Sequence, residues 1–206
     1  MIAIVDYGMG NLRSVQKAVQ RVGGDARIVR TPSEVKEAEK IVLPGVGAFA
    51  DAIDRLRSAK LVGPLVEAAR SDIPFLGVCL GLQLLFDVSH EDGEHTGLGV
   101  LAGKVTRFDF GQSVIGRPLS VPHMGWNQIR PQRPCPLFNG IDNGAYVYFA
   151  HSYHVVPADD DVIATLTHYG YDFVSAVWRA NVFGTQFHPE KSQAVGLKML
   201  ENFVSL

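Results

Sequence analysis

Cys79 is flanked by glycines at both offsets in Gly77-Val78-Cys79-Leu80-Gly81, where an apolar strand-like run ends and a helix-like run begins. This spacing is typical of a nucleophile elbow in which sulfur replaces the serine oxygen. The glycines allow a sharp turn and a close backbone approach. The positive end of the following helix favours the thiolate, which is the form that attacks a carbonyl carbon. A cysteine buried in a core turn is the alternative, but the paired glycines favour a nucleophile.

A base for this nucleophile is present near the other end of the chain, in His188-Pro189-Glu190. The apolar residues 181–187 predict a strand with His188 at its carboxyl end. Residues two apart in an extended chain lie on the same side, so Glu190 is predicted to orient the His188 imidazole. Pro189 is expected to keep His188 extended. A polar exit from a strand is the alternative reading. Parallel sheets gather the carboxyl ends of their strands at one edge, which favours a Cys-His-Glu triad there.

Acyl transfer also needs backbone N–H donors for the developing oxyanion. Leu80, which follows the nucleophile, predicts one donor, and the glycine-rich Pro44-Gly45-Val46-Gly47 predicts another at Val46 or Gly47. The same glycines fit the dinucleotide fingerprint G-x-G-x-x-A, but the next strand ends at Cys79 rather than at an acid. We therefore expect an oxyanion hole here and no nucleotide cofactor.

The elements that must position these groups alternate between strand and helix in the first half of the chain. Strands are predicted over 2–5, 26–30, 40–43 and 73–78, and helices over 12–22, from a Thr31-Pro32-Ser33-Glu34 capping box, over 48–69 with a break at Gly63-Pro64, and over 80–88. Asn11 is expected to cap the first helix. This order predicts an α/β fold with a doubly wound parallel sheet.

The second half is richer in β-branched and aromatic residues. Shorter strands, some of them antiparallel, are predicted over 100–108, 145–155, 162–167 and 173–178, and a closing helix over 192–204. The segment 89–99, with Glu91, Asp92, Glu94 and His95, is expected to be solvated and mobile. We expect one domain spanning residues 1–206, because the chain has no linker or repeat.

Composition limits the remaining function classes. The 206 residues are 47% hydrophobic and carry a net charge of −2, so neither a nucleic-acid partner nor a membrane surface is expected. No apolar stretch is long enough to span a bilayer, and the N-terminus lacks the features of a signal peptide. Two cysteines, Cys79 and Cys135, fit a reducing cytoplasm. The seven histidines show no metal-binding spacing, so no metal is expected.

Together, the Cys79 and His188 segments resemble the class I, triad-type glutamine amidotransferases, which hydrolyse glutamine through a glutamyl thioester and pass ammonia to a synthase. A narrower resemblance is to the glutaminase subunits of imidazole glycerol phosphate synthase, in histidine biosynthesis. It is carried by five motifs, which are Asp6-Tyr7-Gly8-Met9-Gly10-Asn11-Leu12-Arg13-Ser14-Val15, Pro44-Gly45-Val46-Gly47-Ala48-Phe49, Pro122-His123-Met124-Gly125-Trp126-Asn127, Tyr148-Phe149-Ala150-His151-Ser152-Tyr153 and His188-Pro189-Glu190-Lys191-Ser192. The fold implied is class I glutamine amidotransferase-like, a mostly parallel, flavodoxin-like central sheet flanked by helices, with additional antiparallel strands.

The resemblance also implies roles. Cys79 would be the nucleophile, His188 the general base and then acid, and Glu190 the orienting carboxylate. L-Glutamine would be held by Gln83, Ser152 and Tyr153, and the loop at Val46 would supply a donor that can be switched. The partner would be a (β/α)8-barrel cyclase that receives ammonia, with Asn11, Trp126, Tyr148 and Lys191 facing it. No cofactor is implied.

Two residues depart from the pattern of the family. His154 stands where tyrosine or arginine is more usual, and Leu82 where methionine is common. Three alternatives stay open from the sequence: the glutaminase of pyridoxal phosphate synthase, a non-catalytic regulatory or scaffolding subunit of the same fold, and a related cysteine peptidase. The 6–11 and 123–127 segments favour the histidine pathway, and the complete triad favours an enzyme.

Overall fold

The centre of the protein is a parallel sheet whose inner strands are buried on both faces. The computed structural model describes residues 1–111 and 119–206. Five strands lie in the order β2-β1-β3-β4-β14 and run parallel to one another; they are β1 (Ile2–Val5), β2 (Ala26–Val29), β3 (Lys40–Gly45), β4 (Phe75–Cys79) and β14 (Val182–Thr185). Because helices cover both faces, β1, β4 and β14 are buried at every residue, which explains their continuous apolar sequences.

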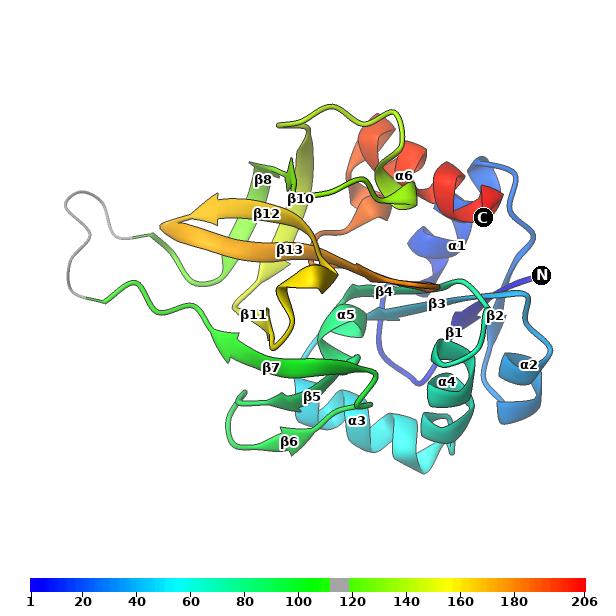
Figure 1. Cartoon of the computed structure of the whole chain (residues 1–206). Coiled ribbons are helices and arrows are strands. Elements are labelled where there is room, and N and C mark those ends of the chain that lie inside the picture. Colours follow the sequence, from blue (N-terminus) through cyan, green and yellow to red (C-terminus); the bar gives the residue numbers. More distant parts are fainter. Residues whose placement is uncertain (112–118) are drawn as a thin grey trace.

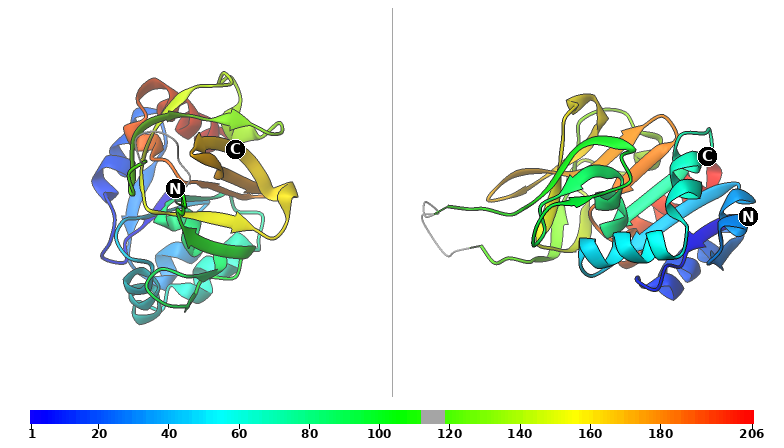
Figure 2. Two further views of the ribbon diagram at one scale, coloured as in Figure 1. Left: turned by 90° about the vertical axis from the view of Figure 1, so that its left-hand side faces the viewer. Right: turned by 90° about the horizontal axis from the view of Figure 1, so that it is seen from below.

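Two helical layers cover this sheet (Figure 1). One layer contains α1 (Leu12–Arg21) and the C-terminal α6 (Gln193–Ser205), and the other contains α2 (Pro32–Lys36), α3 (Phe49–Ser58) and α4 (Val62–Ala69). A short helix, α5 (Leu80–Leu84), follows β4 directly. The turned views in Figure 2 show the helices gathered around the parallel strands, while the antiparallel strands extend away from them.

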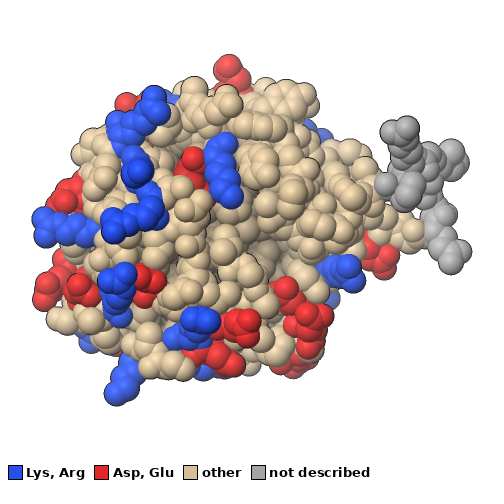
Figure 3. Space-filling view, turned by 180° about the vertical axis from the view of Figure 1, so that it is seen from behind, with Lys and Arg blue, Asp and Glu red and all other residues tan. Residues whose placement is uncertain are grey.

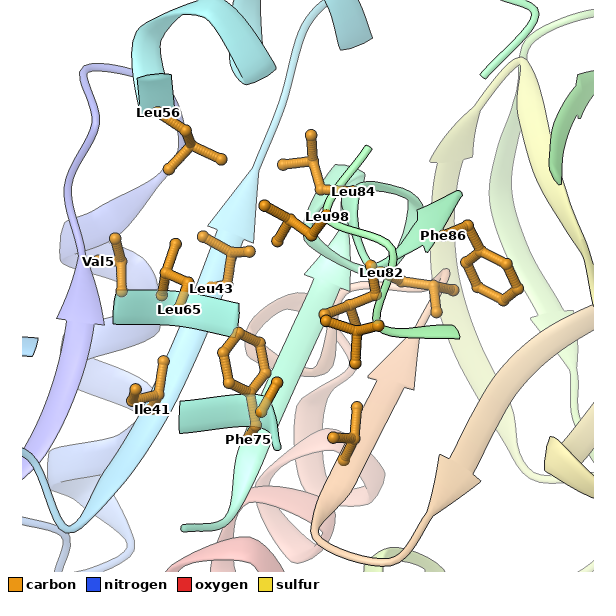
Figure 4. Close-up of a cluster of buried hydrophobic side chains, with 14 of the residues drawn as sticks. Val5, Ile41, Leu43, Leu56, Leu65, Phe75, Leu82, Leu84, Phe86 and Leu98 are labelled. Atoms are coloured by element: carbon orange, nitrogen blue, oxygen red, sulfur yellow. The ribbon is translucent and has the colours of Figure 1, made fainter. Parts of the chain in front are cut away.

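The core under α3 and α4 is built from large aliphatic and aromatic side chains. Figure 4 shows Ile41 and Leu43 from β3 and Phe75 from β4 packed among Leu56, Leu65 and Leu82. All six are 0% exposed. Truncating any one of them to alanine is expected to cost about 2–5 kcal/mol. This packing fixes the positions of β3 and β4, whose carboxyl ends carry the candidate chemistry.

Strands between residues 86 and 179 extend the sheet, and their pairings are antiparallel except for the parallel pairing of residues 86–89 with residues 101–105. Beyond β14 the order continues β13-β11-β7-β5-β6, with β12 and β9 alongside, and β8 pairs with β10 in a separate two-stranded sheet. The bounds are β5 (Phe86–Ser89), β6 (His95–Thr96), β7 (Leu101–Arg107), β8 (His123–Gln128), β9 (Arg130–Pro131), β10 (Tyr146–His151), β11 (Tyr153–Pro157), β12 (Ile163–Tyr169) and β13 (Tyr171–Arg179). Three 3-10 turns are η1 (Pro136–Phe138), η2 (Asp160–Val162) and η3 (Pro189–Lys191).

The predicted α/β fold is confirmed, but several element boundaries were wrong. The helix expected over 80–88 ends at Leu84, and Phe86–Ser89 forms β5, because a strand pairing with β7 buries Phe86 completely. The break expected at Gly63-Pro64 lies earlier, where Lys60 adopts a φ of 57°. Pro64 is tolerated in the first turn of α4, where the proline lacks only an N–H that would be unpaired anyway.

Other predictions from local sequence signals were confirmed only in part. The Thr31 capping box is formed with Glu34 as predicted. Asn11 occupies the N-cap position of α1, but its side chain makes no capping hydrogen bond. The single strand expected over 145–155 is two strands, because Ser152 divides β10 from β11. Among residues 1–111 and 119–206, no helix is both long and apolar enough to cross a bilayer.

Candidate active site

The nucleophile elbow is present at the junction of β4 and α5. Cys79 has a φ of 56° and a ψ of −110°, a conformation that non-glycine residues rarely adopt. A Cβ added to Gly77 would lie 2.7 Å from the Gly81 carbonyl oxygen, and one added to Gly81 would lie 1.8 Å from the Leu43 carbonyl oxygen. Both glycines are therefore required by close packing of the backbone, and the strained turn is at Cys79 itself.

His188 and Glu190 are in contact, as predicted. The distance between His188 Nδ1 and Glu190 Oε1 is 2.8 Å, and the two side chains are only 5% and 3% exposed. The predicted reason was wrong, because Glu190 does not lie on an extended strand. β14 ends at Thr185, His188 is extended, and Pro189–Lys191 forms η3, which turns Glu190 back toward the ring.

Ser192 holds this turn in place, a role that the sequence analysis did not predict. Its hydroxyl donates to the His188 carbonyl oxygen at 2.7 Å and accepts from the Tyr148 N–H at 3.0 Å. The His188 N–H donates to the Tyr148 carbonyl oxygen at 2.9 Å. The backbone on either side of His188 is therefore tied to β10 through polar contacts.

The protonation of His188 follows from its two neighbours. Burial lowers the pKa of His188, but hydrogen bonds to Cys79 and Glu190 and the charges of these two groups outweigh burial and raise it to about 10. Because His188 Nδ1 faces Glu190, Nε2 is the ring nitrogen that remains to interact with the Cys79 sulfur. At neutral pH the imidazole therefore carries a proton that it can deliver to a group bound at Cys79.

A cavity of about 330 Å³ opens over the sulfur and brings most of the predicted residues together. The predicted residues that line it are Val46, Gly47, Cys79, Leu80, Gln83, Ser152, Tyr153, His188 and Lys191. Glu190 lies behind His188, in a narrow cleft that it shares with Asn11 and Val46. A cavity of this size fits an amino-acid substrate.

The predicted oxyanion donors border the cavity. We name residues 46–48, between β3 and α3, the oxyanion loop. Val46 is 41% exposed and Gly47 has a φ of 93°. In the part of the chain that the structure describes, the N–H groups of Val46 and Gly47 make no hydrogen bond to another protein group. The Leu80 N–H is in the first turn of α5, where such groups have no partner within the helix.

Gln83 is held by an internal network. Its amide nitrogen donates to the Tyr153 carbonyl oxygen at 3.0 Å and to Gln186 Oε1 at 3.1 Å. Gln186 Nε2 in turn lies 3.8 Å from the Cys79 sulfur. Both hydrogens of the Gln83 amide are therefore used, and its side-chain oxygen remains to accept from a ligand.

Glu91 also lines the cavity, although the sequence predicted a solvated, mobile loop over 89–99. Its Oε2 accepts from the Phe49 N–H at 2.8 Å, and burial raises the pKa of the Glu91 carboxyl. The one available signal was indirect: α3 begins after Ala48, whose side chain cannot cap a helix, so an acceptor must come from elsewhere.

An aromatic patch lies beside the cavity on the sheet formed by β8 and β10. We define it as Met124, Trp126, Tyr146, Tyr148 and Lys191. Met124, Trp126 and Tyr146 are 65%, 46% and 56% exposed. The Trp126 and Tyr148 rings are 6.0 Å apart between centroids, and Lys191 Nζ lies 5.8 Å from the Tyr148 ring. The patch contains three of the four predicted partner-facing residues, while Asn11 lies in the cleft behind the triad.

Charge is distributed without a dominant sign. On the face shown in Figure 3, acidic and basic side chains lie next to one another, and uncharged surface covers much of the rest. Within the described residues, no group of three or more His, Cys, Asp or Glu side chains is arranged to hold a metal ion. Cys79 and Cys135 are both free thiols.

Sequence comparison identifies the class of protein that this site defines. The profile of the family described as "Glutamine amidotransferase class-I" matches residues 3–206, so the chain belongs to that family. The fold agrees: the structure of PurLQS from Thermotoga maritima covers 99% of this chain and 96% of its own, with a TM-score of 0.76 and 19% identity.

Closer relatives narrow the assignment. The chain is 56% identical over 203 residues to imidazole glycerol phosphate synthase subunit HisH of Syntrophotalea carbinolica, covering 98% of both chains. It is 52% identical over 206 residues to the subunit of the same name from Salinibacter ruber, covering 100% of this chain and 94% of that one. Within the amidotransferases, the chain therefore belongs with the HisH subunits, and the pyridoxal phosphate synthase alternative receives no support.

Proposed function

We propose that this chain is the glutaminase subunit of an imidazole glycerol phosphate synthase, which hydrolyses L-glutamine at Cys79 and passes ammonia to a (β/α)8-barrel cyclase. The observation that supports this most directly is the convergence, around one cavity of about 330 Å³, of Cys79, the His188 imidazole and unpaired backbone donors. Ammonia would then be used to form imidazole glycerol phosphate and an aminoimidazole carboxamide ribotide.

The first half of the reaction forms a thioester. The Cys79 sulfur attacks the side-chain carbonyl carbon of glutamine, and the oxygen becomes negative. Donors from Leu80 and the oxyanion loop stabilise that charge. As the C–N bond breaks, His188 delivers its proton to the departing nitrogen, which leaves as ammonia. The raised pKa of His188 means that the imidazole already holds this proton before the sulfur attacks.

The second half regenerates the enzyme. Water attacks the thioester carbon and gives up a proton to His188, the C–S bond breaks, and glutamate leaves. Glu190, at 2.8 Å from Nδ1, keeps the imidazole in the tautomer that presents Nε2 to the sulfur and stabilises its positive charge. The same imidazole thus serves as acid in one step and as base in the next.

Recognition of the amino-acid end of glutamine is assigned to the far side of the cavity. The Glu91 carboxylate and the unused Gln83 side-chain oxygen are suited to the α-ammonium group, because both are acceptors at the cavity wall. Ser152 and Tyr153 lie at the junction of β10 and β11, where backbone groups can reach the α-carboxylate. Glutamine would then lie across the cavity with its amide at the sulfur.

The aromatic patch is proposed to face the cyclase. The exposed side chains of Met124, Trp126 and Tyr146 together form one apolar surface, which is larger than the surface of a single exposed apolar residue. Lys191 adds a charge at the edge of this surface. Met124 and Lys191 also line the cavity, so ammonia released at Cys79 is next to this surface. Asn11 is assigned to the same interface from the neighbouring cleft.

We also propose that residues 1–206 form one glutamine amidotransferase domain that acts in the cytoplasm without a cofactor. The family profile covers residues 3–206 without interruption, and free thiols at Cys79 and Cys135 fit a reducing compartment. The reaction uses only acid–base and nucleophilic groups that the chain supplies.

The decisive experiment measures glutamate release under three conditions: the chain alone, the chain with a cyclase subunit, and the complex with the cyclase's nucleotide ligand. We expect a large increase only in the third condition, abolished by Cys79→Ala, while ammonium salts still support the cyclase. Equal rates in all three conditions would remove the partner from the proposal. Absence of hydrolysis in all three would favour a scaffolding subunit, and peptide cleavage by the chain alone would favour a peptidase.

A further inference from the structure

We infer that Tyr7 and Glu91 are positioning residues that hold the two ends of the oxyanion loop and thereby determine where its backbone donors point. This inference rests on the proposed function, because the donors matter only if an oxyanion forms at Cys79. Tyr7 belongs to the turn after β1, and Glu91 belongs to the segment after β5. The loop is therefore held by side chains from two other parts of the fold.

Tyr7 holds the start of the loop. Its hydroxyl is buried and donates to the Pro44 carbonyl oxygen at 3.0 Å, one residue before the last residue of β3. Burial raises the pKa of Tyr7, and the charge of Cys79 raises it further. The hydroxyl therefore keeps its proton and remains a donor at neutral pH.

The backbone next to this hydrogen bond has little freedom. A Cβ added to Gly45 would lie 2.5 Å from the Tyr7 hydroxyl oxygen and 2.9 Å from Leu80 Cβ. The chain thus passes between the tyrosine and the nucleophile helix at the point where it leaves β3. The Tyr7 hydroxyl fixes the Pro44–Gly45 peptide plane, which is the last fixed plane before Val46.

Glu91 holds the other end. Ala48 is the N-cap of α3 and has no side chain that can accept a hydrogen bond. The carboxylate of Glu91 takes this role from 42 residues further along the chain and accepts from the Phe49 N–H at 2.8 Å. The same carboxylate lines the substrate cavity. A group suited to the α-ammonium of glutamine is therefore also attached to the loop that must stabilise the oxyanion.

The residues between these two fixed ends have no such restraint. Val46 is 41% exposed, and Gly47, at a φ of 93°, would bring an added Cβ within 2.8 Å of Met9 Cε. With both ends fixed, only the intervening peptide planes can rotate. Misplacement of a catalytic donor by about 1 Å can cost about 10²-fold in rate, so loss of either fixed end is expected to lower kcat.

Tyr7→Phe is the first test, because it removes one oxygen atom and keeps the ring. In the complex with cyclase and nucleotide ligand, we expect kcat for glutamine hydrolysis to fall about 5- to 50-fold, less than the loss of a whole oxyanion donor. KM is expected to stay within about twofold. Alkylation of Cys79 by iodoacetamide should be unchanged, because displacement at a saturated carbon forms no oxyanion. Tyr171→Phe, which removes a hydroxyl bonded to His154 Nε2 at 3.0 Å, is the matched control.

Glutaramate, which is glutamine without its α-amino group, separates the two roles of Glu91. On this substrate Glu91→Ala should still lower kcat, because the loop has lost its second fixed end. Glu91→Gln should lose less of its kcat on glutaramate than Glu91→Ala does, because its amide oxygen can still accept from the Phe49 N–H. If Glu91→Ala matches the wild type on glutaramate, Glu91 acts on the substrate alone and the inference fails at that end.

The failures of the two proposals are distinguishable. If the wild-type complex does not hydrolyse glutamine, the proposed function falls and the inference falls with it. If the wild type is active but Tyr7→Phe keeps its kcat or exceeds it, the positioning role is wrong while the proposed function stands. Equal loss of iodoacetamide reactivity and kcat would likewise overturn positioning, since it would show general damage to the elbow.

Discussion

The two sides of the active site are built by different means. On the nucleophile side, β3, β4 and α5 approach so closely that Gly77 and Gly81 leave no space for a methyl group. On the base side, His188 is held by hydrogen bonds that pass through Ser192 and Glu190. Steric packing therefore fixes the sulfur, and polar contacts fix the imidazole. Adding an atom should therefore displace the sulfur, and removing a polar atom should displace the imidazole.

The largest effect is expected from adding an atom on the nucleophile side. Gly81→Ala would place a Cβ 1.8 Å from the Leu43 carbonyl oxygen, and backbone atoms there cannot move independently of the sheet. We expect the free energy of unfolding to fall by at least about 4 kcal/mol, measured by urea denaturation. Gly63→Ala is the control, since nothing lies within 4 Å of its Cβ. That variant should be neutral or up to about 1 kcal/mol more stable. Equal stability of the two variants would contradict the packing argument.

The next largest effect is expected from a substitution on the base side that removes a charge and keeps the shape of the side chain. Glu190→Gln should lower kcat for glutamine hydrolysis by about 10²–10⁴-fold, because the imidazolium loses its partner and its preferred tautomer. Stability should change little, since the amide oxygen can still accept from His188. Glu201→Gln, in an exposed ion pair with Lys198, should have wild-type activity. Retention of more than about a tenth of the activity would mean that Glu190 does not orient His188.

Removing the hydroxyl that supports the turn should have a smaller effect. Ser192→Ala leaves the buried His188 carbonyl and Tyr148 N–H without this partner, which should cost about 1–3 kcal/mol of stability. Activity should fall less than in Glu190→Gln, because the triad itself is intact. Ser205→Ala serves as control, since that hydroxyl donates to Glu201 in an exposed turn. Matching denaturation curves for the two variants would show that Ser192 is not structural.

The last prediction concerns pH and the buried histidines His123 and His151. Burial lowers the pKa of His123 to about 4 and that of His151 to about 3, below the ordinary value of 6.5. Below pH 6.5 the unfolded chain binds more protons than the folded one, so stability should fall as pH falls from 6.5 toward 4. Urea denaturation at several pH values measures this. His123→Gln should flatten the slope, and an unchanged slope would contradict the assignment.

The same comparison explains what the sequence could and could not predict. Cys79 and its glycines lie in one local segment, so their pattern alone indicated the elbow. The contact between His188 and Glu190 was also predicted, but through an extended strand rather than through η3, because the hydrogen bond from the Tyr148 N–H to the Ser192 hydroxyl is a tertiary contact. Likewise, pairing with β7 overrode the helical pattern beyond Leu84.

Residues that act from a distance had no signal in their own stretch of sequence. Glu91 caps a helix 42 residues away, and Tyr7 contacts Pro44 across 37 residues. Neither relation has a period or a spacing that can be read along the chain. The predicted glutamine-binding and partner-facing residues came from resemblance to a family, and the structure adds how they lie relative to the cavity.

The position of β14 in the sheet has a consequence for synthesis of the protein. This strand, formed by residues 182–185, lies between β4 and β13 and ends three residues before His188. While the ribosome still holds the C-terminal segment, β4 lacks this neighbour and the elbow lacks its imidazole. Cys79 is therefore synthesised 109 residues before His188, so a nascent chain carries the sulfur without its imidazole until residue 188 has been made.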